Sequence, residues 1–194
     1  MKTVFFDIDT QIDFVFPAGA LYVPRAELKL PSIAALNRYA ASQGYPIIST
    51  VDAHGENDPE FRIWRPHCIA GTTGQEKPQS TLVEKPFVVP TWENAPLPDA
   101  SVKQTVVEKQ MLDCFTNPNL SRLIEQYNAV RYVVYGVVTE HCVRCAAMGL
   151  LRTGKRVELV TDATETLHPE ESDRTLREFE QAGGVLTTVS HYLA

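Results

Sequence analysis

The segment "RYVVYGVVTEHCVRCAAMGLLRTG", residues 131–154, decides the fold. It begins with a run of β-branched and aromatic residues at 131–139 and continues into a helix-like stretch at 140–154. A nearly continuous apolar run is typical of a strand buried on both faces, as in a parallel sheet. Glycine just after a helical stretch is a common helix stop, here at Gly154. The segment therefore predicts one strand–helix unit of an α/β fold.

The same alternation recurs along the chain. Further apolar runs lie at 3–9, 45–53, 104–110, 156–163 and 184–190, and further helical segments lie at 31–45, 117–128 and 169–184. Alternating strands and helices predict a three-layer α/β/α fold around a six-stranded, mostly parallel, Rossmann-like sheet. With no linker, internal repeat or low-complexity tract, we expect a single domain over residues 1–194.

Residues 54–103 interrupt this alternation. They hold seven of the thirteen prolines and no convincing helical pattern. An irregular stretch of that length in a compact domain usually lines or covers a site.

Composition narrows the class of protein. The formal charge of −6 argues against a nucleic-acid surface, which needs clustered Lys and Arg. No apolar run approaches the roughly 18 residues of a membrane span, and the N-terminal apolar run contains an acidic residue, unlike a secretory signal. Four cysteines without such a signal indicate free thiols in a reducing compartment. We therefore expect a cytoplasmic protein with no nucleic-acid or membrane partner.

Polar residues follow the ends of the predicted strands. In open parallel sheets, ligands bind at the carboxyl ends of the strands. The residues at these ends are Asp7, Asp9 and Asp13 for the first strand, Asp52 and His54 for the second, Glu108 and Lys109 for the third, and Thr139 and Cys142 for the fourth. We expect them to form a site along one edge of the sheet.

Cys142 is a candidate nucleophile. In the first helical turn it would meet the positive end of the helix dipole, which lowers a thiol pKa. Backbone amides there could hold an oxyanion, Lys109 would add positive charge, and Asp9 could accept and return a proton. The alternative is that Cys142 is a small buried hydrophobe, as many free cysteines are.

The Cys142–Cys145 spacing also suggests a second interpretation, in which the two cysteines form a metal-binding or redox pair. A structural zinc site needs four ligands, and neither Cys68 nor Cys114 belongs to a second such pair. Cys145 lies one turn further along a small-residue helix, so we interpret it as a packing residue.

Four residues around the irregular segment could gather a divalent metal. Asp52 and His54 are two apart at a strand end, and Glu60 and His67 follow. Carboxylate and imidazole ligands suit a borderline divalent ion. The alternative is an ordinary solvated loop end.

Three loop aromatics, Phe14, Trp64 and Phe115, are placed near the same edge. They could sandwich a flat ligand, or they could pack the loops onto the core.

Several ordered motifs carry a resemblance over nearly the whole length. They read "DTQIDF" from Asp9, "VDAH" from Val51, "WRPHCIAGTTGQE" from Trp64, "VVEKQ" from Val106 and "GVVTEHCVRCAA" from Gly136. The chain resembles the isochorismatase-like cysteine hydrolases, and among them it is most similar to the nicotinamidases.

The resemblance implies a catalytic triad of Asp9, Lys109 and Cys142. It also implies a cis peptide bond before Thr139 and oxyanion donors at the amides of Val138 and Cys142. The implied reaction is hydrolysis of a small-molecule amide, such as nicotinamide, through a thioester on Cys142. Relatives are often homo-oligomers, which we expect here by analogy.

Nicotinamidases carry one metal held by Asp, His, His and sometimes Glu. The matching positions are Asp52, His54 and His67, with Glu60 in the variable place; we expect zinc, with iron or manganese as alternatives. Phe14 and Trp64 would correspond to aromatics that clamp the substrate ring.

One stretch departs from the nicotinamidase pattern. After Lys109 the chain reads "QMLDCFTNPNL", so that Leu112, Asp113 and Cys114 could line the pocket differently. The departure leaves the amide chemistry in place and keeps another small amide open as the substrate. A separate alternative is a non-catalytic relative that keeps the fold and binds a small molecule.

Overall fold

A seven-stranded parallel sheet forms the centre of the structure, a computed structural model that describes residues 2–193. The strand order is β3-β4-β2-β1-β5-β6-β7, and every neighbouring pair is parallel. The strands are β1 (Thr3–Ile8), β2 (Ile47–Asp52), β3 (Phe87–Val89), β4 (Gln104–Lys109), β5 (Arg131–Val137), β6 (Arg156–Glu165) and β7 (Val185–Thr187).

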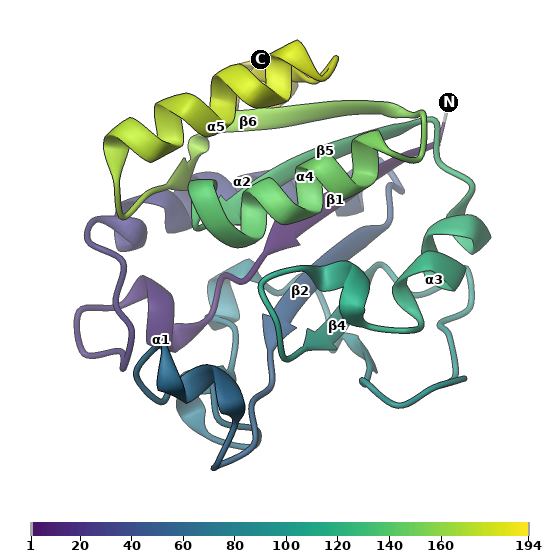
Figure 1. Ribbon diagram of the computed structural model, residues 1–194. Coiled ribbons are helices and arrows are strands. Elements are labelled where there is room, and N and C mark those ends of the chain that lie inside the picture. Colours follow the sequence, from purple (N-terminus) through teal and green to yellow (C-terminus); the bar gives the residue numbers. More distant parts are fainter. Residues whose placement is uncertain (1, 194) are drawn as a thin grey trace.

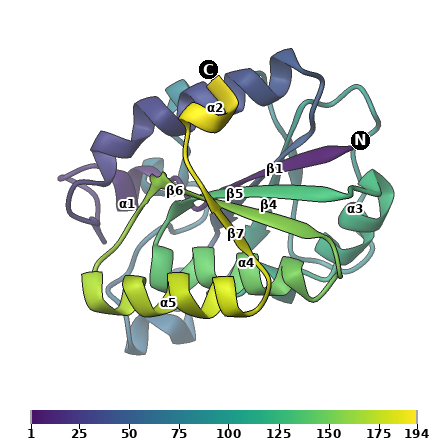
Figure 2. The same ribbon diagram turned by 90° about the horizontal axis from the view of Figure 1, so that it is seen from above.

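Helices cover both faces of the sheet (Figures 1 and 2). One face carries α2 (Leu30–Ser42) and α6 (Ser190–Leu193). The other carries α3 (Leu120–Tyr127), α4 (Arg144–Leu151) and α5 (Pro169–Gln181). The short α1 (Ile12–Val15) follows β1. Within residues 2–193, no helix is long and apolar enough to cross a membrane.

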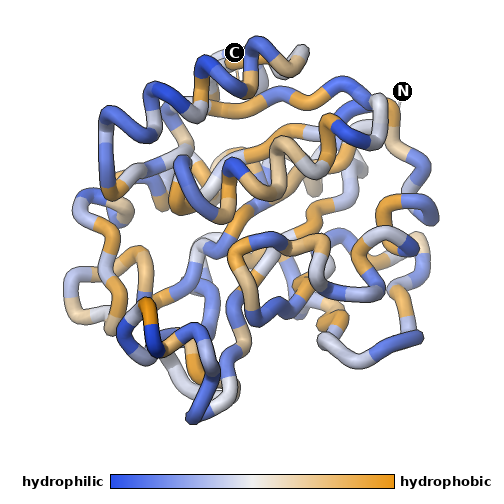
Figure 3. Tube along the Cα trace, viewed as in Figure 1, coloured by the Kyte–Doolittle hydropathy of each residue, from blue (hydrophilic) through white to orange (hydrophobic). Residues whose placement is uncertain are grey.

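Successive side chains of β1 point to opposite faces of the sheet and pack into the core on both sides. Val4, Phe6 and Ile8 pack against the side of α3, α4 and α5, whereas Phe5 packs against α2. The hydropathy trace shows apolar residues concentrated along the sheet and polar ones along the outer helix α5 (Figure 3). Each fully buried large side chain contributes roughly 1.5–3 kcal/mol to folding.

Gly136 allows β1 and β5 to lie close together beneath the predicted site. Its φ is +121°, and a Cβ there would collide with the backbone of Ile8. Only glycine adopts this conformation without strain. The register between β5 and β6 shifts at the same place, between Val134 and Gly136.

The structure confirms the three-layer α/β class and corrects the strand count. Six strands were predicted, but β3 is a seventh, a three-residue edge strand paired with β4. Pro86 and Pro90 flank it, so its apolar run is too short to stand out in the sequence. Within residues 54–103 the structure otherwise has only short 3-10 turns, namely η2 (Pro59–Arg62), η3 (Thr73–Gln75) and η4 (Gln79–Thr81).

Candidate active site

Four adjacent strands deliver the predicted residues to one edge of the sheet. Asp9 follows β1, Asp52 ends β2, Lys109 ends β4, and Cys142 follows β5. Since these strands are neighbours in the order β4-β2-β1-β5 and all run the same way, their carboxyl ends meet. The predicted convergence is present for these four residues, whereas Asp7 contacts Asn37 of α2 and Glu108 lines a separate surface pocket.

Asp9 is fully buried at the turn that leaves β1. Its φ of +46° places it in the left-handed region. The Thr50 hydroxyl donates to Asp9 Oδ1 at 2.6 Å, and the Asp9 amide donates to the Thr50 carbonyl at 3.1 Å. Asp9 Oδ2 lies 2.8 Å from Nζ of Lys109 but accepts no well-aligned hydrogen bond within the described residues. This oxygen is therefore the one available to accept a proton.

Lys109 connects the charged groups of the site. Its ammonium lies 2.8 Å from Asp9 Oδ2 and 2.5 Å from Asp52 Oδ1, and it donates to Cys142 Sγ at 3.6 Å. Burial by itself lowers a lysine pKa, but the carboxylates of Asp52 and Asp9 outweigh it and hold the pKa of Lys109 well above its ordinary value. Lys109 is therefore charged, beside the sulfur.

The Cys142 thiol behaves differently from the sequence-based expectation. A helix-terminal thiol was predicted to have a lowered pKa, but burial raises the pKa of Cys142 well above its ordinary value. The positive charge of Lys109 lowers this pKa, and the negative charges of Asp9 and Asp52 raise it further. The side chain is 7% exposed, so desolvation of a thiolate outweighs the dipole. The resting group is a thiol, and its attack requires a base.

The turn that presents Cys142 begins at the end of β5. A cis peptide bond joins Val137 to Val138, one residue earlier than the predicted position before Thr139, because β5 already ends at Val137. The Val138 carbonyl accepts from the amides of His141 and Val143. Residues Thr139–Val143 form a π turn, η6, rather than the predicted start of an α-helix. Such turns are frequent at functional sites.

Two side chains tie this turn to the segment after β6. The Thr139 hydroxyl donates to the Glu165 carbonyl at 3.0 Å. Glu140, which is buried, accepts from the amides of Leu167 and His168 at 2.9 and 2.8 Å. Since Leu167 lines the pocket, these contacts join one pocket wall to the nucleophile turn.

Asp52, His54 and His67 form a cluster with metal-ligand geometry. Asp52 Oδ2 lies 3.9 Å from Nε2 of His54 and 3.8 Å from Nε2 of His67, and one ligand atom of each residue lies within 4.8 Å of the others. Asp58 Oδ2 lies 3.1 Å from His54 Nδ1, and the Arg65 carbonyl lies 2.7 Å from His67 Nδ1. The Arg65 carbonyl fixes the orientation of the His67 ring, as outer partners do at metal sites, whereas neither ring nitrogen of His54 has a hydrogen-bond partner among residues 2–193.

The charges of the cluster also fit a cation. The buried Nε2 of His54 has no hydrogen-bond partner among residues 2–193. Burial lowers the pKa of His67 and favours the neutral imidazole that ligates metals. Burial and the Asp52 charge raise the pKa of Glu60. Glu60 lines the pocket beside the cluster but lies outside the three-residue group.

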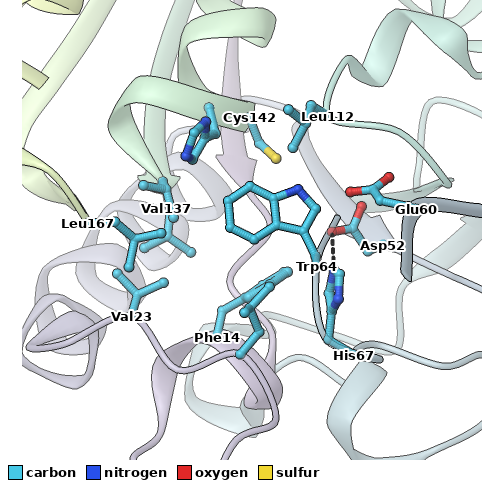
Figure 4. A pocket seen from close by; sticks show the side chains of 13 residues that line it. Phe14, Val23, Asp52, Glu60, Trp64, His67, Leu112, Val137, Cys142 and Leu167 are labelled. Carbon is cyan, nitrogen blue, oxygen red and sulfur yellow. Dashed lines mark ion pairs between the residues drawn. The ribbon is translucent and has the colours of Figure 1, made fainter. Parts of the chain in front are cut away.

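A small apolar pocket connects the cluster with Cys142 (Figure 4). It encloses about 420 Å³ of empty space including its open mouth. Phe14 and Trp64 lie within it as predicted, and in the close-up the sulfur of Cys142 points toward the indole of Trp64. Its lining is Phe14, Leu21, Val23, Asp52, Glu60, Trp64, His67, Leu112, Val137, Val138, His141, Cys142 and Leu167.

Phe115 does not belong to this pocket, contrary to prediction. Asp113 caps a 3-10 turn, η5 (Cys114–Thr116), by accepting from the Phe115 amide at 2.9 Å. This turn packs the Phe115 ring against Gly149 of α4, at the edge of the core. Of the three residues in the departing stretch, only Leu112 lines the pocket.

The thiols of the remaining cysteines do not face the pocket. All four cysteines are free, and only Cys142 lines the pocket. Burial raises the pKa values of Cys68, Cys114 and Cys145. These thiols are therefore protonated and weakly nucleophilic.

Several residues that shape the site were not predicted from the sequence. Leu21, Val23 and Leu167 line the pocket from loops that carry no recognisable pattern. Gln11 could have been found, because it stands inside the quoted motif at 9–14. Its side chain donates to the Asp52 carbonyl at 2.9 Å and accepts from the Asp52 amide at 2.7 Å, which fixes the end of β2.

Comparison with known proteins identifies the family of the chain. A model of the isochorismatase domain matches residues 3–191. Nicotinamidase from Escherichia coli (strain K12) is 20% identical over 206 residues, which cover 95% of this chain and 94% of that protein. Nicotinamidase from Saccharomyces cerevisiae is 21% identical over 201 residues, covering 86% and 89%.

A solved structure extends the comparison. The pyrazinamidase of Pyrococcus horikoshii in complex with zinc superposes with a TM-score of 0.80 at 27% identity, covering 97% of this chain and 99% of that one. The chain therefore belongs to the isochorismatase domain family, and it is a hydrolase of that family.

Proposed function

We propose that the protein hydrolyses a small aromatic carboxamide, nicotinamide in the first instance, through a thioester on Cys142. The observation that carries the proposal is the convergence of Asp9, Lys109 and the Cys142 thiol, with Cys142 in the wall of an apolar pocket. A base, a fixed positive charge and a nucleophile in mutual contact are what nucleophilic catalysis requires.

In the first half of the reaction, Asp9 accepts the thiol proton as sulfur attacks the amide carbonyl. The amides of Val138 and Cys142 stabilise the oxyanion, and Lys109 stabilises negative charge on the sulfur. As the tetrahedral intermediate collapses, protonated Asp9 donates its proton to the departing nitrogen. The C–N bond breaks, and ammonia and a thioester are formed.

In the second half, water attacks the thioester carbonyl while Asp9 accepts one of its protons. Collapse breaks the C–S bond and releases the carboxylic acid, and the proton held by Asp9 returns to Cys142. One water is consumed for each amide cleaved. Because burial raises the pKa of Cys142, Asp9 is needed in both halves rather than only in the second.

Asp52, His54 and His67 would hold one divalent ion, for which we propose zinc, with iron or manganese as alternatives. The unpartnered Nε2 of His54 and the position of both Nε2 atoms beside Asp52 Oδ2 support this assignment. When bound, the ion would supply a Lewis acid that orients and polarises the ring nitrogen of the substrate. Glu60 is positioned to complete the ligand set if its side chain turns toward the ion.

The pocket supports a flat, largely apolar substrate. Trp64 and Phe14 offer aromatic faces, and Leu112 adds an apolar wall in the stretch that departs from the nicotinamidase pattern. Nicotinamide fits this description, and other pyridine or pyrazine carboxamides share its chemistry. A panel of such amides distinguishes among them.

The deciding experiment measures ammonia release from nicotinamide, pyrazinamide and benzamide by the metal-replete protein. We expect release that Cys142→Ala abolishes and that Cys145→Ala, its matched control one turn away, leaves within twofold of the parent. No release from any amide would favour the non-catalytic alternative, and loss with Cys145→Ala alone would contradict the nucleophile assignment.

Metal analysis forms the second part of the test. We expect close to one equivalent of divalent metal in the parent protein and a large loss in His54→Ala. A low metal content that is the same in both proteins would contradict the proposed ligands.

A further inference from the structure

A buried ion pair lies directly behind the site, on the side of the sheet that faces α2. Lys77 Nζ lies 3.0 Å from Asp7 Oδ2, and the two side chains are 3% and 0% exposed. Neither residue lines the pocket, and the reaction proposed above uses neither of them. A buried ion pair repays its desolvation only with good geometry and further hydrogen bonds, so such a pair often serves something other than stability.

The pair closes around the backbone on both sides of Asp9. Besides Asp7, the Lys77 ammonium donates to the Thr10 carbonyl at 3.2 Å. The Thr10 hydroxyl donates in turn to Asp7 Oδ1 at 2.5 Å. Contacts at residues 7 and 10 therefore bracket Asp9, whose φ of +46° is uncommon outside glycine. The bracket holds that conformation.

Asp7 is itself fixed from two other elements. Asn37 of α2 donates to Asp7 Oδ2 at 2.8 Å, and the Tyr135 hydroxyl of β5 donates to Asn37 Oδ1 at 2.5 Å. Both Asn37 and Tyr135 are fully buried. The carboxylate that holds Lys77 is therefore part of the rigid centre of the fold.

The segment that carries Lys77 is also joined to the residues after Asp9. Gln11 donates from its side chain to the Gln75 carbonyl at 2.8 Å, and the Ile12 amide donates to the Glu76 carbonyl at 2.9 Å. Residues 75–77 thus run beside residues 10–12. The irregular segment that carries the proposed metal ligands therefore returns to the start of the chain here, and Lys77 supplies a charged contact between the two stretches.

We propose that Lys77, through Asp7 and Thr10, is a positioning residue that holds the backbone of Asp9 in the geometry needed for proton transfer. The catalytic role of Asp9 in this proposal rests on the proposed function. The contacts among Lys77, Asp7 and Thr10 are independent of that function. A displacement of about 1 Å at a catalytic group can cost about 100-fold in rate, so loss of the anchor should lower kcat about 10- to 100-fold. KM should change by less than about threefold, because the pocket walls are untouched.

The obvious variant, Lys77→Met, leaves Asp7 charged and buried without its partner and could fail to fold. The double variant Asp7→Asn with Lys77→Met removes both charges and keeps side-chain oxygen and nitrogen at position 7. Neutral replacement of a buried ion pair is often tolerated, so the double variant is expected to fold. Because Met has no ammonium group, the double variant also loses the hydrogen bond from position 77 to the Thr10 carbonyl.

The experiment compares the parent and the double variant by kcat and KM for nicotinamide and by amide hydrogen exchange. We expect kcat to fall as stated and the amides of Asp9, Gln11 and Ile12 to exchange about tenfold faster or more. Amides of β5 serve as internal references and should be unchanged. Tyr192→Phe, which removes a buried hydroxyl contact to Glu158, is the matched control. It should lower the melting temperature and leave kcat within twofold.

Parent-like kcat in the double variant would overturn the proposal, because Lys77 would then only neutralise Asp7. A tenfold or greater loss of kcat in Tyr192→Phe would also overturn it, since general destabilisation would explain both results. If the parent releases no ammonia from any amide, the proposed function fails. The exchange comparison then still decides whether Lys77 holds Asp9, with unchanged exchange counting against it.

Discussion

Replacing Asp9 by Asn should separate activity from stability. The centre of the site holds two carboxylates, Asp9 and Asp52, and one ammonium, Lys109, all with side chains at most 5% exposed. The substitution removes one negative charge and leaves Lys109 paired with Asp52 at 2.5 Å. The amide oxygen of Asn can still accept from Thr50, as Asp9 Oδ1 does at 2.6 Å. The Asn NH2 group then replaces Oδ2 beside the Lys109 ammonium and sets two donors against each other, so the free energy of unfolding should fall by roughly 1–2 kcal/mol.

Activity should respond very differently to the same substitution. Asn cannot accept the Cys142 proton, and that proton must be removed in every turnover because burial raises the thiol pKa. General base catalysis contributes about 100- to 10,000-fold, so kcat should fall by at least that range. The activity assay is ammonia release by the metal-replete protein, and thermal unfolding is measured on metal-free samples of the same preparations.

Lys109→Met gives the contrasting case at the same centre. It leaves the carboxylates of Asp9 and Asp52 buried without a cation, and an unpaired buried charge costs roughly 3–5 kcal/mol. For a chain of this size, 1 kcal/mol corresponds to about 2–4 °C in melting temperature, so a fall of about 6–20 °C is expected. An Asp9→Asn variant that loses as much stability as Lys109→Met, or that keeps a tenth of the parent kcat, would refute this account of the charges.

Three further predictions follow from individual contacts. Because burial raises the pKa of Cys142, iodoacetamide should alkylate it more slowly at pH 7 than it alkylates free cysteine. The alkylation rate should increase with pH up to and beyond pH 9, and a rate independent of pH would contradict this. Phe115→Ala should lower the melting temperature and leave KM for nicotinamide unchanged, whereas Trp64→Ala should raise KM at least tenfold. Although burial raises it, hydrogen bonds from Tyr192 and Arg156 hold the pKa of Glu158 below its ordinary value. Ionised Glu158 therefore stabilises the fold at pH values above its unfolded pKa of about 4.3, and this contribution is lost as the pH falls through the lower folded pKa. In Glu158→Gln, the free energy of unfolding should fall less steeply as the pH is lowered through this range.

Most of the site could be predicted from the sequence because parallel strands impose a simple geometry. Apolar runs identified β1, β2, β4 and β5, and polar residues at the ends of such strands meet at one edge whatever the details of packing. This reasoning, without any structure, brought together Asp9, Asp52, Lys109 and Cys142. It missed β3, whose three residues are too few to show a pattern.

Only the tertiary structure decided the properties that depend on surroundings. The sequence indicated a lowered pKa for Cys142 from the helix start, whereas burial against neighbouring segments raises it. Phe115 was placed near the site by its position in a loop, but a capped turn directs it into the core. Burial and side-chain direction are set by long-range contacts, which local patterns do not contain.

The contact between Lys77 and Asp7 shows the same division. Seventy residues separate the two side chains in the chain, and neither belongs to a recognisable motif. The sequence by itself determined the order of strands and helices and the edge at which chemistry gathers, because periodicity and strand direction are local properties. Folding decided which side chains lose water, which charges meet and which backbone turns are held, because those depend on residues brought together from distant parts of the chain.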